Sequence, residues 1–477
     1  MVKPEMVLSY LFFLKKNGKH TETGKYMNET LSKNRMGYEP VGKLLISMSW
    51  PAILSMMVNA LYNIIDSMFV GMICEDALSA VTYAYPVVML NVAFAVGTGV
   101  GINSLMSRRL GAGRIEEAQK VANHGIRLAI MNWILFAIFG IFLAKPYLHA
   151  YTDTQYILTG GLHYMQITNI CSIFVMTSIM IERLFQATGK MKVPMIASLT
   201  GAVANTVLDP LFIFGIGPFP EMGIEGAAVA TVLGQAFSFI INLTSLKRHN
   251  DIFNIRLRGF RFEKQILADI YQVAFSAIVM QSITSVMLLF MNGILVKFSE
   301  TAVAVIGSYF RLQTFVFMPI FGMNQGAMPI IGYNYGARNR DRLMKTFNYS
   351  FLIAFCYMTL GFLIFQLFPA QLLGLFSAGE HMLSIGIPAL KTISWSFIMA
   401  SFCIMSITLF QATGHGLLSV MSPIIRQLLG IIPIAYILIN SFGLNSVWLA
   451  FPIAEIMGTI WSICGFAWIM KHEIKTM

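Results

Sequence analysis

Long apolar segments, separated by short polar stretches, recur from about residue 44 to residue 470. Each has roughly 20 to 30 residues, enough for an α-helix to cross the hydrocarbon core of a bilayer, which is about 30 Å thick. The pattern predicts twelve such helices, near residues 44–71, 77–106, 124–144, 158–182, 193–217, 223–246, 268–296, 302–332, 346–369, 384–409, 418–441 and 445–470. The chain is therefore expected to form an all-α polytopic membrane protein.

Basic residues test this number of helices. With twelve alternating spans, 28 of the 33 lysines and arginines fall on the side that holds both termini, whereas only Lys145 and Lys297 fall on the other side. Lysine and arginine are enriched in cytoplasmic loops. Both termini are therefore predicted to be cytoplasmic, in a multi-pass protein of the cell (inner) membrane.

The two halves of the chain repeat each other. The hexapeptide LFQATG occurs at residues 184–189 and again at 409–414, and the same offset of 225 residues relates Gly97 to Gly322. Because each half holds an even number of helices, both halves enter the membrane in the same direction, as in repeats related by an axis along the membrane normal. The sequence thus predicts two six-helix lobes with pseudo-twofold symmetry about the membrane normal.

These boundaries divide the chain into five parts. They are a cytoplasmic N-terminal extension (1–43), an N-terminal lobe (44–246), a cytoplasmic linker (247–267), a C-terminal lobe (268–470) and a cytoplasmic tail (471–477). The apolar run at 7–14 is too short to span a membrane, and no small-residue cleavage site follows it, so it does not predict a signal peptide. No function is assigned to residues 1–26.

Composition agrees with a membrane protein and excludes other classes. The 477 residues are 56% hydrophobic and only 12% charged, well below the charged share of soluble domains. The net charge of +11 falls in short clusters between apolar segments, so no nucleic-acid partner is expected. Five cysteines without CxxC spacing and eight histidines without HExxH predict neither disulfides nor a metal site. With no hydrolase motif either, neither an enzyme nor a cofactor is predicted.

Three polar residues in the first half are the strongest candidates for chemistry. Asn205 and Asp209 lie four residues apart, which places them on one face of a helix, and Pro210 disturbs the backbone carbonyl of Thr206. Asp66 lies in the first predicted helix. At the offset of 225, the positions that correspond to the three candidates hold Met291, Gly430 and Ile434. A polar residue present in one half only points to function and not to the shared scaffold.

Depth supports a common site. Asp66 and Asp209 are predicted about 8 to 12 Å from the outer ends of their helices. Two carboxylates in a low-dielectric pocket cannot both ionise cheaply, so such a pocket can exchange protons, or bind a small hard cation with the help of Asn205. The alternative is a structural hydrogen-bonded group, since amides often only join helices. Acidic residues within membrane spans usually have a functional role, which favours the functional interpretation.

Other charged or polar positions within spans leave two interpretations open. Tyr164, Arg311, Lys391 and Glu455 are possible cavity-lining residues, although each can equally pair across helices or pack. The same holds for Arg426. Glu182 and Arg183 are adjacent near the cytoplasmic end of their helix, where they can snorkel or pair locally.

Several motifs together resemble the multidrug and toxic compound extrusion (MATE) family. They are WPAILSMMVNALYNIIDSMFVG, LGAG, and GAVANTVLDPLFIFG followed by GIEGAAVATVLGQ, and the resemblance covers roughly residues 36–470. It implies a twelve-helix transporter that expels cationic amphipathic compounds in exchange for H⁺ or Na⁺. In the branch with its cation site in the N-terminal lobe, the family's key residues match Asp66, Asn205 and Asp209. The helix-bending proline of that branch matches Pro51.

The function predicted from the sequence is secondary active multidrug export by alternating access, driven by H⁺ or Na⁺ and carried out by a monomer in the bilayer. A lipid-linked oligosaccharide or other lipid flippase is the main alternative, and it would need basic residues in the cavity to hold pyrophosphate. Arg311, Lys391 and Arg426 are the candidates for that role. An intramembrane protease with Asp66 and Asp209 as a dyad, and a channel, fit the duplicated halves less well.

Overall fold

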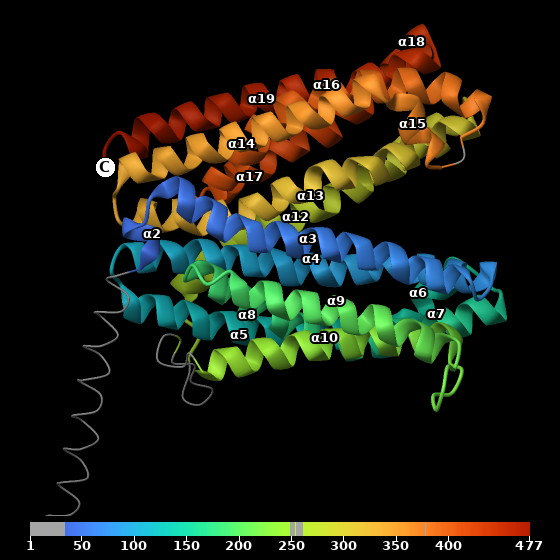
Figure 1. The fold of residues 1–477 in the computed structure, drawn as a ribbon, viewed down its shortest axis with the longest axis horizontal. Helices are drawn as coiled ribbons and strands as arrows, with labels where there is room; N and C mark the ends of the chain where they lie inside the picture. Colours follow the sequence, from blue (N-terminus) through green and yellow to red (C-terminus); the bar gives the residue numbers. More distant parts are fainter. Residues whose placement is uncertain (1–33, 249–252, 254–260, 377) are drawn as a thin grey trace, which may run out of the picture.

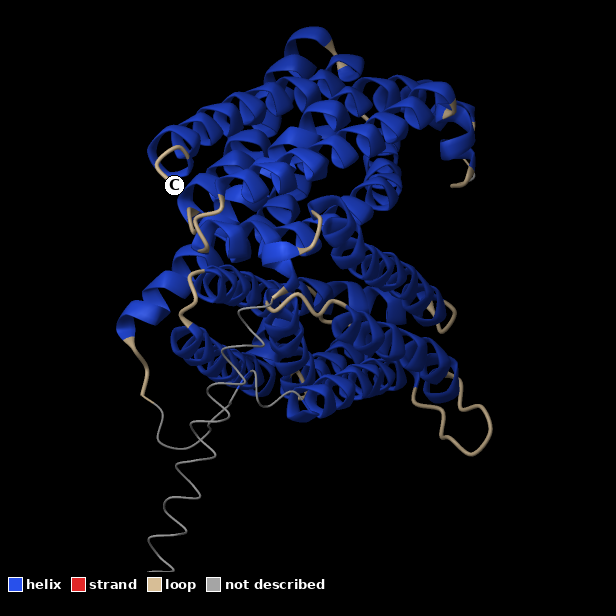
Figure 2. Ribbon diagram, turned by 60° about the vertical axis from the view of Figure 1, so that its left-hand side comes forward, coloured by secondary structure: helices blue, strands red, loops and turns tan. Residues whose placement is uncertain are grey.

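The computed structural model describes residues 34–248, 253, 261–376 and 378–477. These residues form two helical bundles that lie against each other, and Figure 2 shows no strand in the described part of the chain. The predicted N-terminal extension as far as residue 33 lies outside the described residues, as do residues 249–252 and 254–260 of the predicted linker.

The first lobe follows a short helix, α2 (Arg35–Tyr38). It contains α3 (Val41–Gly71), α4 (Glu75–Gly111), α5 (Ile115–Ile138), a π-helical segment (Phe139–Leu143), α6 (Ala144–His149), α7 (Gln155–Ile170), α8 (Ile173–Ala187), α9 (Lys192–Ile213) and α10 (Gly223–Arg248). In Figure 1 this lobe runs from blue through green.

The second lobe occupies the yellow to red part of Figure 1. It contains α12 (Lys264–Leu295), α13 (Glu300–Gly336), α14 (Arg340–Leu367), α15 (Pro369–Gly374), α16 (Glu380–Thr413), α17 (Gly416–Pro423), a π-helical segment (Ile424–Ile431), α18 (Ile432–Phe442), a 3₁₀ segment (Leu444–Leu449), α19 (Ala450–Ile469) and a last π-helical segment (Met470–Ile474).

The twelve predicted spans and the two-lobed fold class are confirmed. Among the described residues, eleven helical stretches are long and apolar enough to cross a membrane, and the bent pair α7 and α8 makes the twelfth span. Each predicted range overlaps one of these spans. Most of the observed helices extend several residues further at one or both ends, because the polar first and last turns of a helix do not contribute to an apolar pattern.

One difference from the prediction is the break in the fourth span. The sequence pattern predicts one helix near 158–182, whereas α7 and α8 meet at an angle of 42°. Trp133 donates its indole N–H to the carbonyl of Ile170 over 2.7 Å, and the Ser172 hydroxyl donates to the Asn169 carbonyl over 2.8 Å. These side chains satisfy carbonyls at the break, so the helix can bend without leaving buried acceptors unpaired.

The contact between the lobes repeats the pseudo-twofold symmetry residue by residue. Gly97 packs on Ile278, and the residues at the offset of 225, Gly322 and Ile53, pack on each other. In the same way the pair of Gly101 with Ala274 is matched by Gly326 with Ser49, and the pair of Gly111 with Tyr333 by Gly336 with Arg108. Reciprocal contacts of this kind define a twofold interface. These glycines therefore serve close helix packing.

All of these contacts lie toward one end of the bundle. This end carries Asn34 and the C-terminus, together with most lysines and arginines, and we call it the basic end (Figure 1). Ion pairs tie the lobes together there. Arg109 of α4 pairs with Asp269 of α12 over 3.2 Å, and Lys120 of α5 pairs with Glu263 over 2.8 Å.

The α2 segment also spans the two lobes at the basic end. Arg35 donates to the carbonyl of Gly189 in the first lobe over 2.7 Å. From the second lobe, Asn334 and Arg342 donate to the carbonyl of Met36 over 3.2 and 3.1 Å, and the Met36 side chain is fully buried. The residues just before the first span therefore help to hold this end closed.

Toward the opposite end the lobes separate, as the diverging ribbons of Figure 1 indicate. A residue that lies seven, eleven or eighteen positions along an α-helix from a contact residue points within about 20° of the same direction as that contact residue. Residues that continue the contact faces in this way are exposed: Asn63 and Ser67 on α3, Pro86 and Leu90 on α4, Gln281 and Ser285 on α12, and Arg311 and Phe315 on α13. We call the space between these exposed faces the interlobe cleft.

Substitution of an interface glycine tests this packing. In Gly326→Val, the new side chain would collide with the backbone of Ser49. We expect a loss of stability of about 1 to 3 kcal/mol, because overpacking forces helices apart. Thermal denaturation of the purified protein measures it. Gly293→Val is the matched control, since a Cβ at Gly293 meets nothing within 4 Å; equal melting temperatures for the two variants would contradict the assignment.

Candidate functional site

The three first-lobe candidates lie on helices that pack together. Asp66 is on α3, near the end opposite the basic end, and Asn205 and Asp209 are on α9, which packs against both α3 and α10. Asp209 is fully buried and Asn205 nearly so, whereas Asp66 is partly buried. Pro210 lies inside α9, which ends three residues later at Ile213.

Asn205 joins Asp209 to a residue that the sequence analysis did not single out. Its amide Nδ2 donates to Oδ1 of Asp209 over 3.2 Å and lies 3.5 Å from Oγ1 of Thr231 on α10. The close approach of α10 depends on Gly234, where a Cβ would lie 2.9 Å from the Cβ of Asn205. We call Asp66, Asn205, Asp209 and Thr231 the first-lobe oxygen cluster.

Three oxygens of this cluster are buried and accept no hydrogen bond from the described residues. They are Oδ1 of Asp66, Oδ1 of Asn205 and Oδ2 of Asp209. A buried acceptor without a donor is costly, by about 1 to 3 kcal/mol or more when it is charged. A proton on a carboxylate would remove the charge, and a small hard cation would coordinate the oxygens directly. The residues present fit either species.

Two tyrosines lie near the carboxylates. Asp66 and Asp209 interact electrostatically with each other, and both interact with Tyr62 of α3 and Tyr164 of α7. Tyr164 was a sequence candidate, and it is almost completely buried beside this cluster. Tyr62 was missed, although its position four residues before Asp66 on one helix face could have indicated it.

Pro51 lies far from these oxygens on the same helix. It is buried, and α3 continues through it from Val41 to Gly71. Fifteen residues separate it from Asp66, or about 22 Å along a helix. Its neighbours Ala52 and Ile53 contact Gly322 of the second lobe. A bend at Pro51 would therefore change the helix face that the two lobes share.

In the second lobe the acid and one of the bases form a buried pair. Arg426 donates to both carboxylate oxygens of Glu455, over 3.1 and 3.3 Å, and their side chains are 18% and 6% exposed. At the offset of 225 the first lobe has Gly201 and Ala230 at these positions. Only the second lobe therefore has this ion pair. Within it, each residue neutralises the charge of the other.

The remaining basic candidates lie apart from this pair. Arg311 is exposed on α13, and Lys391 is exposed on α16, where Gln366 donates to its backbone carbonyl over 2.7 Å. Gln411 and Gly414, which contact the first lobe through Ser104 and Arg108, lie about 140 to 200° around α16 from Lys391. The structure therefore does not gather the span arginines and lysines into one anion site.

Glu182 and Arg183 each find a local partner, as one of their two sequence interpretations expects. Asn242 donates to Glu182 over 3.1 Å, and Arg183 donates to Oε1 of Gln186 over 2.9 Å. Gln186 in turn donates to Gln325 of the second lobe over 3.2 Å. Through Gln186, Arg183 therefore belongs to a polar connection between the lobes, whereas Glu182 is held within the first lobe.

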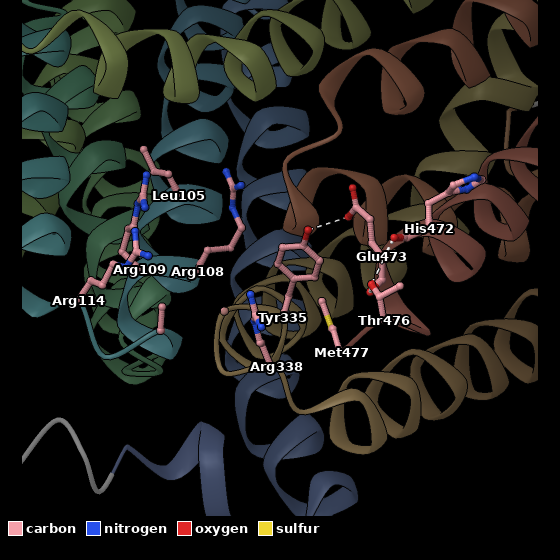
Figure 3. Close-up of a pocket in the computed structure, with 12 residues that line it drawn as sticks. Leu105, Arg108, Arg109, Arg114, Tyr335, Arg338, His472, Glu473, Thr476 and Met477 are labelled. Atoms are coloured by element: carbon pink, nitrogen blue, oxygen red, sulfur yellow. Dashed lines mark hydrogen bonds between the residues drawn. The ribbon is translucent and has the colours of Figure 1, made fainter.

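A pocket at the basic end was not predicted from the sequence (Figure 3). It has a volume of about 480 Å³, and its lining includes Arg108, Arg109, Arg114 and Arg338. Across it, Tyr335 donates to Glu473 over 2.6 Å, which ties α13 to the end of the chain. The nearby Arg108 donates to the carbonyl of Thr413 over 3.3 Å. The pocket thus lies where the lobes are joined, and the first-lobe oxygen cluster lies toward the other end.

Comparison with known proteins relates this architecture to transporters. A family model described as MatE matches residues 51–211 and 276–437. The multidrug export protein MepA of Staphylococcus aureus (strain N315) is 25% identical over 447 residues, which cover 90% of this chain and 92% of that protein. A FAD transporter of Shewanella oneidensis is 23% identical over 423 residues, which cover 88% and 92%.

Solved structures show the same likeness. One is described as the outward-facing conformation of a multidrug resistance MATE family transporter of the MOP superfamily. It superposes with a TM-score of 0.85 and 27% identity, covering 93% of this chain and 99% of that one. The match includes both lobes, so the likeness extends to the arrangement of the whole bundle.

Proposed function

Because the chain belongs to the MATE family, whose members are transporters and not enzymes, we propose that it is a secondary active exporter that exchanges H⁺ or Na⁺ for amphipathic organic compounds. The basic end faces the cytoplasm of the cell, and the interlobe cleft opens to the outside. One chain supplies both lobes, so a monomer is sufficient for the transport cycle.

The observation that carries this proposal is the set of three buried oxygens without donors in the first-lobe oxygen cluster. An ion or proton from outside binds there and neutralises Asp66 and Asp209. Each positive charge that moves inward across the membrane contributes about 2.3 kcal/mol per 100 mV of membrane potential. That free energy is available to drive export when the two movements are coupled.

Coupling requires that ion binding changes the cleft. Asp66 lies on the same helix as Pro51 and the contact residue Ile53. We propose that neutralisation of Asp66 lets α3 bend or repack near Pro51, which lowers the affinity of the outward-facing cleft for substrate. The reciprocal glycine interface then separates as the lobes rock, and the cleft opens to the cytoplasm.

Two other substrate classes are alternatives to the cationic compounds that the family resemblance implies. The likeness to a FAD transporter favours an aromatic substrate with anionic groups. A lipid-linked oligosaccharide flippase would need a cluster of cations for pyrophosphate, and Arg426 is already paired with Glu455 while Lys391 lies on the far side of α16. The geometry therefore gives the flippase less support.

Reconstitution tests the proposed function. The purified full-length protein in liposomes is expected to move a fluorescent aromatic cation against its concentration gradient when a Na⁺ or pH gradient of the right direction is imposed. Collapse of the gradient with an ionophore should abolish the accumulation. Dye movement equal to that of protein-free liposomes under both gradients would contradict the proposal.

A further inference from the structure

Four helices form the walls of the interlobe cleft, namely α3, α4, α12 and α13. Their charged residues cluster at the helix ends, with one exception. Arg311 of α13 is the only charged residue of these four helices that lies more than six residues from a helix end. Asp66 is five residues from the end of α3. Away from the helix ends, these four helices therefore carry a single formal charge, and it is positive.

By its position on α13, the exposed Arg311 continues the contact face of the helix into the cleft. Gly322, on the same helix, contacts Ile53 of the first lobe, and eleven residues separate it from Arg311, which corresponds to a rotation of about 20°. Asp66, in contrast, has a buried Oδ1 and interacts electrostatically with Asp209, so its carboxylate is turned into the first lobe. No acidic residue of the cleft walls at this depth thus faces Arg311.

Arg311 is exposed and forms no hydrogen bond or ion pair with the described residues. A guanidinium within a span is costly to retain unless it has a partner. It differs in this from Arg426, whose charge is matched by Glu455. Because no described residue pairs with Arg311, its guanidinium is available to a ligand in the cleft.

The surroundings of Arg311 indicate the shape of that partner. Phe315 lies one turn deeper on the same face and is 49% exposed, and a Cβ at Gly307, one turn in the other direction, would meet nothing within 4 Å. An aromatic body can stack on Phe315. Its anionic oxygens can accept two parallel N–H bonds from the planar guanidinium.

We propose that Arg311 binds the carboxylate or phosphate of amphipathic aromatic substrates in the interlobe cleft, and so extends the substrates of this exporter to compounds with an anionic group. The inference rests on the proposed export function. Arg311 lies in the second lobe, whereas the proposed site of ion coupling lies in the first lobe. Its role is therefore to determine substrate specificity and not to bind the coupling ion. A phospholipid phosphate offers the same oxygens, and the test separates it from a soluble ligand.

The experiment uses two probes with the same aromatic body and opposite charge, pyrenebutanoate and pyrenylmethyl trimethylammonium. The full-length protein is placed in nanodiscs of phosphatidylcholine, and probe binding is followed by fluorescence. Arg311→Gln should weaken pyrenebutanoate binding at least about tenfold and leave the cationic probe unchanged or bound more tightly. Lys391→Gln is the matched control, because Lys391 also lies eleven residues after the start of its helix but on the side away from the first lobe.

Three results would overturn the inference. They are absence of pyrenebutanoate binding to the wild type, equal loss of both probes in Arg311→Gln, and a dependence on Arg311 that appears only when phosphatidylglycerol is added to the nanodiscs. The last result would assign Arg311 to a lipid headgroup. Because binding is measured without an ion gradient, these outcomes are distinct from a failure of ion-driven export in liposomes.

Discussion

The variant Asp209→Asn is expected to lose ion-driven export, with a rate lower by about 100-fold. The carboxamide keeps the size of the side chain but removes its charge and one acceptor oxygen. The oxygen that remains can still accept from Nδ2 of Asn205, as Oδ1 does over 3.2 Å, and the N–H₂ group then replaces the buried Oδ2 and can neither coordinate a cation nor take up a proton. A group that supports a bound ion through an outer shell is already worth about 10- to 100-fold in affinity, and a direct ligand is worth at least as much.

Dye export from liposomes under an imposed gradient measures this loss. Asp66→Asn should behave in the same way, because its Oδ1 is one of the three buried oxygens without a donor. Asp76→Asn, at an exposed acid near the start of α4, should export at the rate of the wild type. If Asp209→Asn and Asp76→Asn export equally well at equal protein levels, the first-lobe oxygen cluster is not the coupling site.

The second large effect concerns stability. Glu455→Gln is expected to destabilise the protein by about 3 to 5 kcal/mol, because it leaves the buried guanidinium of Arg426 without its counter-charge. The double variant Arg426→Met/Glu455→Leu should recover most of this loss. An apolar pair of similar volume has no desolvation penalty, and the corresponding positions of the first lobe are the uncharged Gly201 and Ala230.

Thermal denaturation in detergent compares the three proteins directly. Glu380→Gln, at an exposed acid in the same lobe, is the control for a change of charge alone. A wild-type melting temperature in Glu455→Gln would show that the pair does not stabilise the second lobe. Recovery of stability together with normal dye export in the double variant would further assign the pair to the scaffold and not to coupling.

The twelve spans and the duplication could be predicted because both are patterns along the sequence itself and do not depend on which helices pack together. Apolar length alone selects a span, and the fixed offset of 225 residues indicates which glycines correspond. The break between α7 and α8 could not be found in this way. It depends on Trp133, a residue of another helix, which satisfies a carbonyl at the break.

The candidate site was predicted only in part. The absence of Asp66, Asn205 and Asp209 from the second half was a sequence signal, but Thr231 enters the site through the close approach of α10 at Gly234. Its counterpart in the second half is an isoleucine, so the same asymmetry test would have found it. The direction in which an arginine within a span points could not be predicted from the sequence. An almost wholly apolar helix has no polar face that would indicate it, so the packed bundle is needed.

The central claim is that an ion bound in the first lobe is exchanged for an organic substrate in the cleft. The most direct measurement follows both fluxes at once. Liposomes with the purified protein are loaded with dye and placed in dye-free buffer without an ion gradient, and the movement of H⁺ or Na⁺ is recorded as the dye leaves. The account predicts that dye efflux drives one of these ions inward in the wild type and that Asp209→Asn abolishes this counter-movement. Dye efflux without any counter-movement of ions in the wild type, or an unchanged counter-movement in Asp209→Asn, would contradict it.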